Sequence, residues 1–193
     1  MQQIITLLAC LSFFFQPCTA ATLGDALRKK TNAPETASVA SVRNGLMQCS
    51  LQRVELVSKL VLPDCAFGAE TYTAPESCIL LLVCGEACNE GAKSVHFQLP
   101  KFVDARGRHF DPEDIVRYKD EELPLMGASL NPGRKYRFVC FFIVPVESIL
   151  GGSLEFEKDL FCLDDEPTTL LKLPLTEESS IAENVVLEGV TDM

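Results

Sequence analysis

Apolar residues along this chain gather in short blocks separated by polar or turn-forming residues. The clearest block is residues 136–146 (YRFVCFFIVPV), which follows an Asn-Pro-Gly turn at residues 131–133. Its β-branched and aromatic side chains are typical of a strand, and a strand this apolar must be covered by another layer. Residues 76–86 (ESCILLLVCGE) form a second continuous block, of the kind buried on both faces. The pattern therefore predicts a layered β-protein.

Shorter strands are predicted before and after these blocks. Residues 51–62 fit either a helix or a strand by their spacing, and their valines and the Pro-Asp stop that follows favour a strand. Residues 95–103 also suit a strand, in which Pro100 marks an edge position or a bend. Two more strands are expected at residues 153–163 and 169–175, and apolar and polar residues alternate at the start of the first.

Turn signals separate these strands. Residues 104–108 (DARGR) predict a hairpin turn, with Gly107 supplying a positive φ. Residues 111–114 (DPED) combine an N-cap, a proline and acids, and predict a short helical turn near residues 112–119. Short strands separated by turns, with little helix, favour an all-β fold: a single immunoglobulin-like antiparallel β-sandwich rather than a barrel.

The first twenty residues are typical of a targeting segment. Residues 4–15 are apolar and uncharged but too short to span a membrane, which takes roughly 20 residues. Small residues before a cleavage point after Ala20 predict a signal peptide at residues 1–20, although its start carries no basic side chain. The Leu-Leu-Ala-Cys sequence ending at Cys10 leaves an alternative, lipidation of Cys10 and anchoring to a membrane. No later apolar run reaches membrane length, so the mature chain is not expected to span a bilayer.

The expected domain lies between two less structured ends. Residues 21–48 include a small, polar, proline-bearing stretch and are predicted to be a flexible segment. Residues 176–193 contain five acids and no base, which predicts an acidic disordered tail. The sandwich itself is expected at residues 49–175, and the length of 193 residues suits one domain.

The net charge narrows the choice of partners. The chain carries a net charge of −10 and has a pI near 4.7, which disfavours nucleic acid and anionic membrane surfaces as partners. The absence of Trp excludes the antibody-type core of Cys, Trp and Cys. Removal of residues 1–20 would leave seven of the nine cysteines, and an oxidising compartment would pair many of them. The disulfide candidates are Cys49, Cys65, Cys78, Cys84, Cys88, Cys140 and Cys162.

Three sequence elements now follow one another in a recognisable order. The first is a strand that runs into an Asn-containing loop, at residues 79–89. The second is a hairpin with the pattern F-x-L…V-D-x-x-G-R-x-F, at residues 97–110. The third, at residues 130–156, is an L-x-P-G turn and a strand that ends in V-P, followed by L-x-F. This order resembles the telokin-like, immunoglobulin-fold domains of exported bacterial proteins, a group that includes mycobacterial immunoprotective secreted antigens. The resemblance covers roughly residues 49–175 and implies a fold and an exported location, but no site residues. The chain departs from the family in its many cysteines and in Pro100.

The sequence offers little support for a metal site, a cofactor or catalysis. The cysteine spacings are not the tight pairs of structural zinc. His96 and His109, the only two histidines, both precede Cys140, which does not suit blue copper, and no serine-nucleophile signature is present. A cluster of acids could form a weak calcium site, although solvated charge is the simpler interpretation. The calcium candidates are Asp111, Glu113, Asp114, Asp120, Glu121 and Glu122.

Basic residues gather at two places on this acidic chain and could form a patch for an acidic protein or glycan partner. Protection of strand edges by basic side chains is the simpler alternative. The patch candidates are Lys101, Arg106, Arg108, Arg134, Lys135 and Arg137. The leading hypothesis is therefore a non-enzymatic exported domain that acts in binding or surface architecture through its loops or a sheet edge. A secreted hydrolase or thiol-redox protein using an unpaired cysteine, and a lipid-anchored envelope protein, remain as alternatives.

Overall fold

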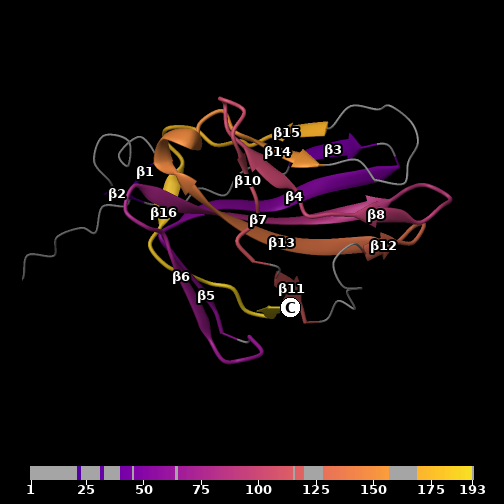
Figure 1. The fold of residues 1–193 in the computed structure, drawn as a ribbon, viewed down its shortest axis with the longest axis horizontal. Helices are drawn as coiled ribbons and strands as arrows, with labels where there is room; N and C mark the ends of the chain where they lie inside the picture. Colours follow the sequence, from indigo (N-terminus) through magenta and orange to yellow (C-terminus); the bar gives the residue numbers. More distant parts are fainter. Residues whose placement is uncertain are drawn as a thin grey trace, which may run out of the picture.

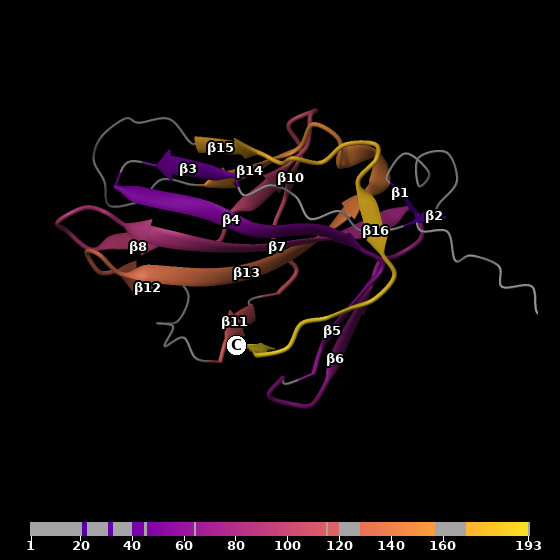
Figure 2. The same ribbon diagram turned by 180° about the vertical axis from the view of Figure 1, so that it is seen from behind.

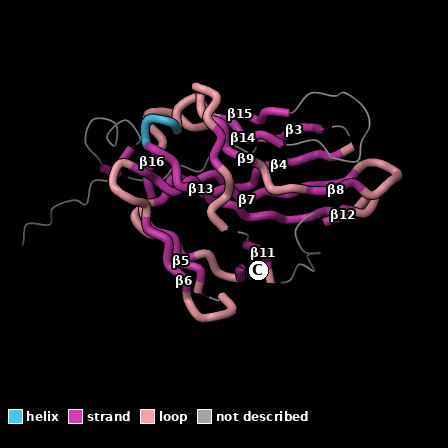
Figure 3. The backbone as a smooth tube through the Cα atoms, viewed as in Figure 1, coloured by secondary structure: helices cyan, strands magenta, loops and turns pink. Residues whose placement is uncertain are grey.

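The computed structural model describes residues 21–22, 31–32, 40–44, 46–63, 65–114, 116–119, 128–156 and 169–192. The expected signal peptide, Cys10, Cys162 and the acids at residues 120–122 lie outside the described residues. Most of the described chain forms strands, which Figure 3 shows in magenta, together with the 3-10 helix η1 (Val146–Ser148) in cyan. No helix among the described residues is long and apolar enough to cross a membrane.

The strands form one large sheet and three small ones. In spatial order, the main sheet consists of β18 (Val190–Asp192), β11 (Val116–Tyr118), β13 (Lys135–Pro145), β7 (Cys78–Asn89), β4 (Met47–Val57), β16 (Ser180–Ala182), β1 (Ala21–Thr22) and β2 (Thr31–Asn32), with β3 (Ser41–Asn44) also paired to β4. The four-stranded sheet consists of β10 (His109–Phe110), β9 (Lys101–Val103), β14 (Ser153–Phe156) and β15 (Thr169–Lys172). The three-stranded sheet consists of β17 (Val185–Val186), β5 (Lys59–Leu62) and β6 (Glu70–Thr73), and β12 (Ala128–Leu130) pairs with β8 (Val95–Phe97).

The main sheet is covered on both faces. Figures 1 and 2 show β10, β14 and β15 on one side of β7 and β13, and β5 and β6 on the other. Strand β7 pairs antiparallel with β4 and β13 along most of its length, so it lies at the centre of the sheet. This arrangement confirms the expected all-β, antiparallel β-sandwich, with parallel pairs only where β16 meets β4 and β17 meets β5 among the described strands.

Strand β7 contributes alternate side chains to two separate cores, because neighbouring residues of a strand point to opposite faces. Leu81 and Val83 lie in the first core, under the four-stranded sheet, with Phe102 and Phe142. Its intervening residues lie in the second core, under the three-stranded sheet; they are Leu80, Leu82 and Cys84. The prediction that residues 76–86 are buried on both faces is therefore confirmed for residues 79–85, whereas Glu76 and Ser77 are exposed before the strand begins.

Several local predictions are confirmed. Residues 51–62 are extended and lie in β4 and β5. The chain bends at Pro100, because β8 ends at Phe97 and β9 begins at Lys101. Gly107 and Gly133 have φ values of 78° and 72°, as their turns require.

The helical turn expected near residues 112–119 is wrong. Residues 116–118 form β11 instead, and Val116 is buried opposite Val139 of β13. The amide of Glu113 donates to the carbonyl of Phe141 at 2.9 Å, so this segment is bonded to β13 and does not form a helical turn. Pairing with the sheet thus overrides a local helix-start signal.

Both ends of the domain are more ordered than their composition predicts. Residues 41–44 and 47–48, expected in a flexible segment, form β3 and the start of β4. Residues 180–192, expected in a disordered tail, form β16, β17 and β18, and bury Ile181, Val185, Leu187 and Val190. The acids Glu183 and Glu188 remain exposed between these side chains. Alternating apolar residues, rather than the total of acids, decide the structure here.

No disulfide joins any two of the six cysteines that the structure describes, so the expected pairing is not found among them. For two of the possible pairs, the strand register shows why. Cys84 and Cys88 are four residues apart on β7, about 13 Å, whereas a disulfide needs Cα atoms within roughly 7 Å. Cys49 and Cys140 face the same core, but Cys49 lies opposite Ala87 of β7 and Cys140 lies opposite Val83. These two positions of β7 are also four residues apart.

Candidate binding surface on the projecting hairpin

Strands β5 and β6 form a hairpin that projects from the body of the molecule, at the bottom of Figure 1. Phe67 lies in its connecting turn, and its side chain is 98% exposed. The amide of Gly68 donates to the carbonyl of Cys65 at 3.0 Å, and the φ of 112° at Gly68 allows the tight turn. The neighbouring Ala66 and Ala69 are exposed as well. The hairpin thus presents an aromatic ring to solvent among small residues.

The exposure of Phe67 is unusual for an aromatic side chain. Phe normally buries well over 100 Å² of apolar surface, and each Å² left in water forgoes roughly 25 cal/mol. Among the described residues, the other exposed large hydrophobic side chains are Leu46, Leu170 and Val186, at 43%, 57% and 49%. Val186 belongs to the same three-stranded sheet, where it lies opposite Val61, which in turn lies opposite Thr71. The outer face of this sheet is therefore lined with β-branched residues that end near Phe67.

The hairpin is held firmly against the main sheet. Leu60 and Leu62 are fully buried in the second core. The ring of Tyr72 packs edge-on against Phe141 of β13, with ring centroids 4.6 Å apart. On the other side of β5, the amide of Leu187 donates to the carbonyl of Val61 at 2.9 Å. These contacts make the hairpin a fixed projection, which lowers the entropy cost of binding through its tip.

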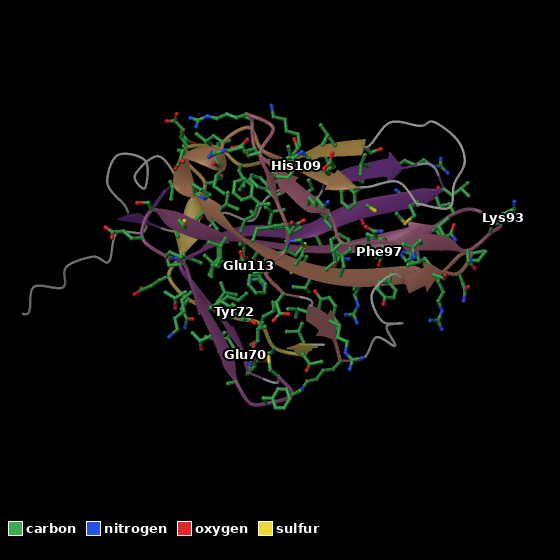
Figure 4. The ribbon with its side chains drawn as sticks, in the orientation of Figure 1. Glu70, Tyr72, Lys93, Phe97, His109 and Glu113 are labelled. Carbon is green, nitrogen blue, oxygen red and sulfur yellow. The ribbon has the colours of Figure 1, made fainter. Side chains whose placement is uncertain are left out.

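The hydroxyl of Tyr72 links the hairpin to the segment before β11. It lies 2.6 Å from an oxygen of Glu70 and 2.6 Å from an oxygen of Asp114, and its single proton serves one of them at a time. Burial and the two neighbouring carboxylates raise the pKa of Tyr72 far above its ordinary value, so the hydroxyl keeps its proton. Figure 4 shows Glu70 and Tyr72 on the same side of the hairpin.

The calcium candidates are only partly brought together. Asp114 meets Tyr72, whereas Glu113 is exposed and Asp111 lies 3.9 Å from the amine of Lys101. Asp120, Glu121 and Glu122 lie outside the described residues. Within the described ranges, no group of three or more His, Cys, Asp or Glu residues could hold a metal ion. Glu70, the carboxylate that does approach Asp114, is 44 residues away in sequence, and spacing alone gave no sign of it.

The basic candidates occupy two separate places. Lys101, Arg106 and Arg108 belong to the β9–β10 hairpin, where Phe102 packs beside Phe142 of β13 at 6.2 Å between rings. Arg134 and Lys135 are exposed at the other end of β13, seven residues or roughly 23 Å from Phe142. The odd-numbered positions of β13, including Val139 and Phe141, face the second core, whereas Phe142 faces the first. The two basic groups therefore lie far apart along β13, and Lys135 belongs to the face of this strand opposite to that of Phe142.

Most of these basic side chains already have acidic or aromatic partners. Lys135 donates to Glu86 at 2.7 Å, and the guanidinium of Arg137 lies 4.4 Å from the ring centre of Tyr118. Arg108 donates to Asp104 at 2.7 Å and also to the hydroxyl of Ser148. These contacts support strand and hairpin structure, and leave the basic residues without a common surface.

Asp104 closes the β9–β10 hairpin. Its carboxylate accepts hydrogen bonds from the amides of Arg106 and Arg108 at 2.8 and 2.9 Å, besides the Arg108 side chain. Burial raises the pKa of this carboxyl, but the hydrogen bonds and charge of Arg108 outweigh that effect and hold the pKa at about 2. The V-D-x-x-G-R motif therefore stabilises its own turn, and Arg108 also joins it to Ser148.

Burial favours the protonated, less reactive form of three thiols, those of Cys49, Cys84 and Cys140. Burial raises the pKa of Cys49 to about 12 and that of Cys140 well above its ordinary value. Burial also raises the pKa of Cys84 to about 11, although Arg53 and Tyr118 partly oppose the shift. A thiol becomes a good nucleophile only as a thiolate, so these three sites offer little to a thiol-redox reaction.

The two histidines are placed apart. His109 of β10 lies 2.9 Å from a carboxylate oxygen of Glu155. His96 lies in β8, opposite Ser129 of β12, in a different sheet. Cys140 is fully buried in the first core. The structure therefore does not gather the three residues considered for copper.

Comparisons with known proteins concern the fold. No protein-family model and no curated protein sequence matches this chain. The structure of the yjhA protein from Bacillus subtilis is similar with a TM-score of 0.50 and 18% identity, covering 73% of this chain and 99% of that one. A β-sandwich protein from Clostridium difficile has a TM-score of 0.44 and 14% identity, over 74% of this chain and 97% of that one.

A longer protein also shows partial similarity. It is the ycdA protein from Bacillus subtilis, thought to be a lipoprotein, with a TM-score of 0.48 and 14% identity. The match covers 71% of this chain, which spans 39% of that protein. At such an identity the likeness to the yjhA protein concerns the fold alone and carries nothing about activity.

Proposed function

We propose that this chain is an exported, non-enzymatic binding domain that engages a protein partner through the tip of the β5–β6 hairpin. The observation that carries the proposal is Phe67, whose ring is 98% exposed on a projection that is itself firmly packed. Exposed aromatic rings are frequent anchors of protein interfaces because they bury much surface at little entropy cost. The finer assignment, to the telokin-like domains of exported bacterial proteins, rests on the motif order and agrees with the sandwich fold.

Export is part of this proposal and rests on residues 1–20. Mass spectrometry of the mature N-terminus is expected to find Ala21 as the first residue. A lipid-modified Cys10 would favour the anchored alternative, and a chain beginning at Met1 would contradict export.

The binding proposal is tested by capture of the partner from the envelope or medium of the producing cells. Phe67→Ser is expected to lose a partner that the unchanged chain captures, while its melting temperature stays the same because the ring makes almost no intramolecular contact. Leu170→Ser is the matched control, since Leu170 is an exposed apolar residue in a different sheet. Retention of the partner by Phe67→Ser, or its loss in both variants, would contradict the proposal.

A further inference from the structure

Strand β6 forms an open edge of the three-stranded sheet. It pairs with β5, and no other strand among the described residues pairs with it. Strand β5 pairs with β17 on its other side, so β6 is the outer strand. In Figure 3 the β5–β6 hairpin stands away from the four-stranded sheet and from β8 and β12.

The orientation of the backbone groups of β6 follows from two hydrogen bonds. The carbonyl of Val61 accepts from Leu187 and therefore points towards β17, away from β6. The amide of Ala74 donates to Ser58 on the β5 side at 3.0 Å. Because backbone groups alternate in direction along a strand, Thr71, opposite Val61, and Thr73 direct their amides and carbonyls outward.

Within the part of the chain that the structure describes, this edge lacks the features that usually prevent pairing. Proteins protect edges with lysine, proline, bulges or covering segments. Residues 70–73 (ETYT) contain neither lysine nor proline, and their register with β5 runs without a bulge. The side chains of Thr71 and Thr73 are exposed and β-branched, which suits a strand that receives another strand.

The charge around the edge favours a basic partner segment. Glu70 begins β6, and the exposed Glu76 follows it shortly after its end. Asp114 lies beside Tyr72, in the middle of the strand. Lys59 is the one base in β5 and β6, and the whole chain carries a net charge of −10. A second copy of this chain would meet repulsion here, whereas a lysine- or arginine-bearing segment would be attracted.

We propose that β6 accepts an extended, basic segment of the partner protein as an added fourth strand, with Phe67 covering an apolar side chain at one end of that segment. This inference rests on the proposed function and specifies the class of partner. Backbone hydrogen bonds to Thr71 and Thr73 supply affinity, while the acids and Phe67 select basic and apolar side chains.

The probe is a fluorescent eight-residue peptide of alternating valine and lysine, measured by anisotropy with the full mature chain. Thr71→Pro removes an outward donor but leaves the bonds to β5, and is expected to weaken binding at least tenfold. Thr71→Val keeps the donor and the branched shape, and is expected to bind as the unchanged chain does. A peptide with glutamate in place of lysine is expected to bind at least tenfold more weakly.

A second binding measurement uses only the unchanged chain, so it does not depend on whether the Thr71→Pro variant folds. Methylation of the backbone nitrogens of the valine–lysine peptide removes its donors on both edges, and is expected to abolish its binding to the unchanged chain. Equal binding of the methylated and unmethylated peptides, equal binding of the glutamate peptide, or absence of binding would overturn the inference. So would a dimer of the unchanged chain that Thr71→Pro dissociates in sedimentation, because a second copy would then occupy the edge.

The inference and the proposed function can fail separately. If Phe67→Ser loses the captured partner while a folded Thr71→Pro retains it, the tip binds the partner without strand addition, and the inference alone is overturned. Loss of that partner in both variants, with Thr71→Val retaining it, supports the inference.

Discussion

Asp104 is buried whereas Phe67 is exposed, and in each case the turn that contains the residue determines this. Asp104 is buried and accepts hydrogen bonds from two amides and a guanidinium, so its charge stabilises the β9–β10 hairpin. Phe67 lies in a turn that projects past the core, so its side chain stays almost fully exposed. The first residue therefore contributes to stability, and we infer that the second contributes to binding.

Asp104→Asn is expected to make unfolding less sensitive to acid. The pKa of Asp104 is lowered in the folded chain, so its stabilising effect is fully present above the ordinary value of 3.8 and is lost as the pH falls towards about 2. In the variant, the free energy of unfolding is expected to be lower at neutral pH and to fall less steeply over that range. Urea unfolding at several pH values measures this effect.

Asp111→Asn is the matched control, because Asp111 is also an acid of this hairpin region but its side chain is 80% exposed. Its profile is expected to follow that of the unchanged chain. An acid profile of Asp104→Asn that matches the unchanged chain would refute the stabilising role.

At the scale of elements, the sandwich depends on close approach between strands and turns. Phe102 of β9 fills the first core under Gly152, just before β14, where a Cβ atom would overlap the phenyl ring. Phe102 also packs beside Phe110 and Phe142, at 5.8 and 6.2 Å between ring centroids. The absence of a side chain at position 152 thus lets β14 close over the core.

Gly152→Ala is expected to destabilise the chain by about 1–3 kcal/mol, because the added methyl group forces the Phe102 ring out of its place. Chemical denaturation measures the change in the free energy of unfolding. Ser153→Ala, at the next and only half-buried position, is expected to change it by less than about 0.5 kcal/mol. Equal stability of Gly152→Ala and the unchanged chain would show that the core can accommodate the methyl group, and would contradict the close contact between position 152 and Phe102.

Local chemistry in the sequence was enough to predict much of the strand pattern, and long-range packing accounts for what it could not predict. Valine-rich segments, Pro100 and the glycine turns act over a few residues, so the strands, the bend and the turns that they form could be predicted. The helix-start signal at residues 111–114 gave a wrong prediction because burial of Val116 against β13 stabilises the chain more than a local helical turn would. Tyr72 and Asp114 meet across 42 residues of sequence, and the exposure of Phe67 depends on how far the hairpin projects, so neither could be read from spacing.

At the scale of the whole molecule, two cores on either side of β7 stabilise the fold without disulfides among the described cysteines. Cys49, Cys65, Cys84 and Cys140 are buried within or beside these cores, and Cys78 and Cys88 are half-buried. Cysteine here serves as a small apolar side chain.

A reducing agent is therefore expected to leave the melting temperature of the mature chain unchanged. Brief alkylation of the native chain is expected to label Cys78 and Cys88 before the four buried cysteines, because access limits the reaction. Peptide mapping by mass spectrometry assigns each label and separates Cys162 from the others. A fall in melting temperature on reduction, traced to a pair among these six residues, would contradict this arrangement.

The most direct test of binding through the hairpin tip is photo-crosslinking from position 67. Phe67 is replaced by p-benzoyl-phenylalanine, a similar but reactive aromatic side chain, and the mature chain is irradiated in the envelope or medium of its producing cells. We expect one dominant protein adduct from position 67 and none from the same substitution at Leu170. No adduct from position 67, or the same adducts from both positions, would contradict binding through the hairpin tip.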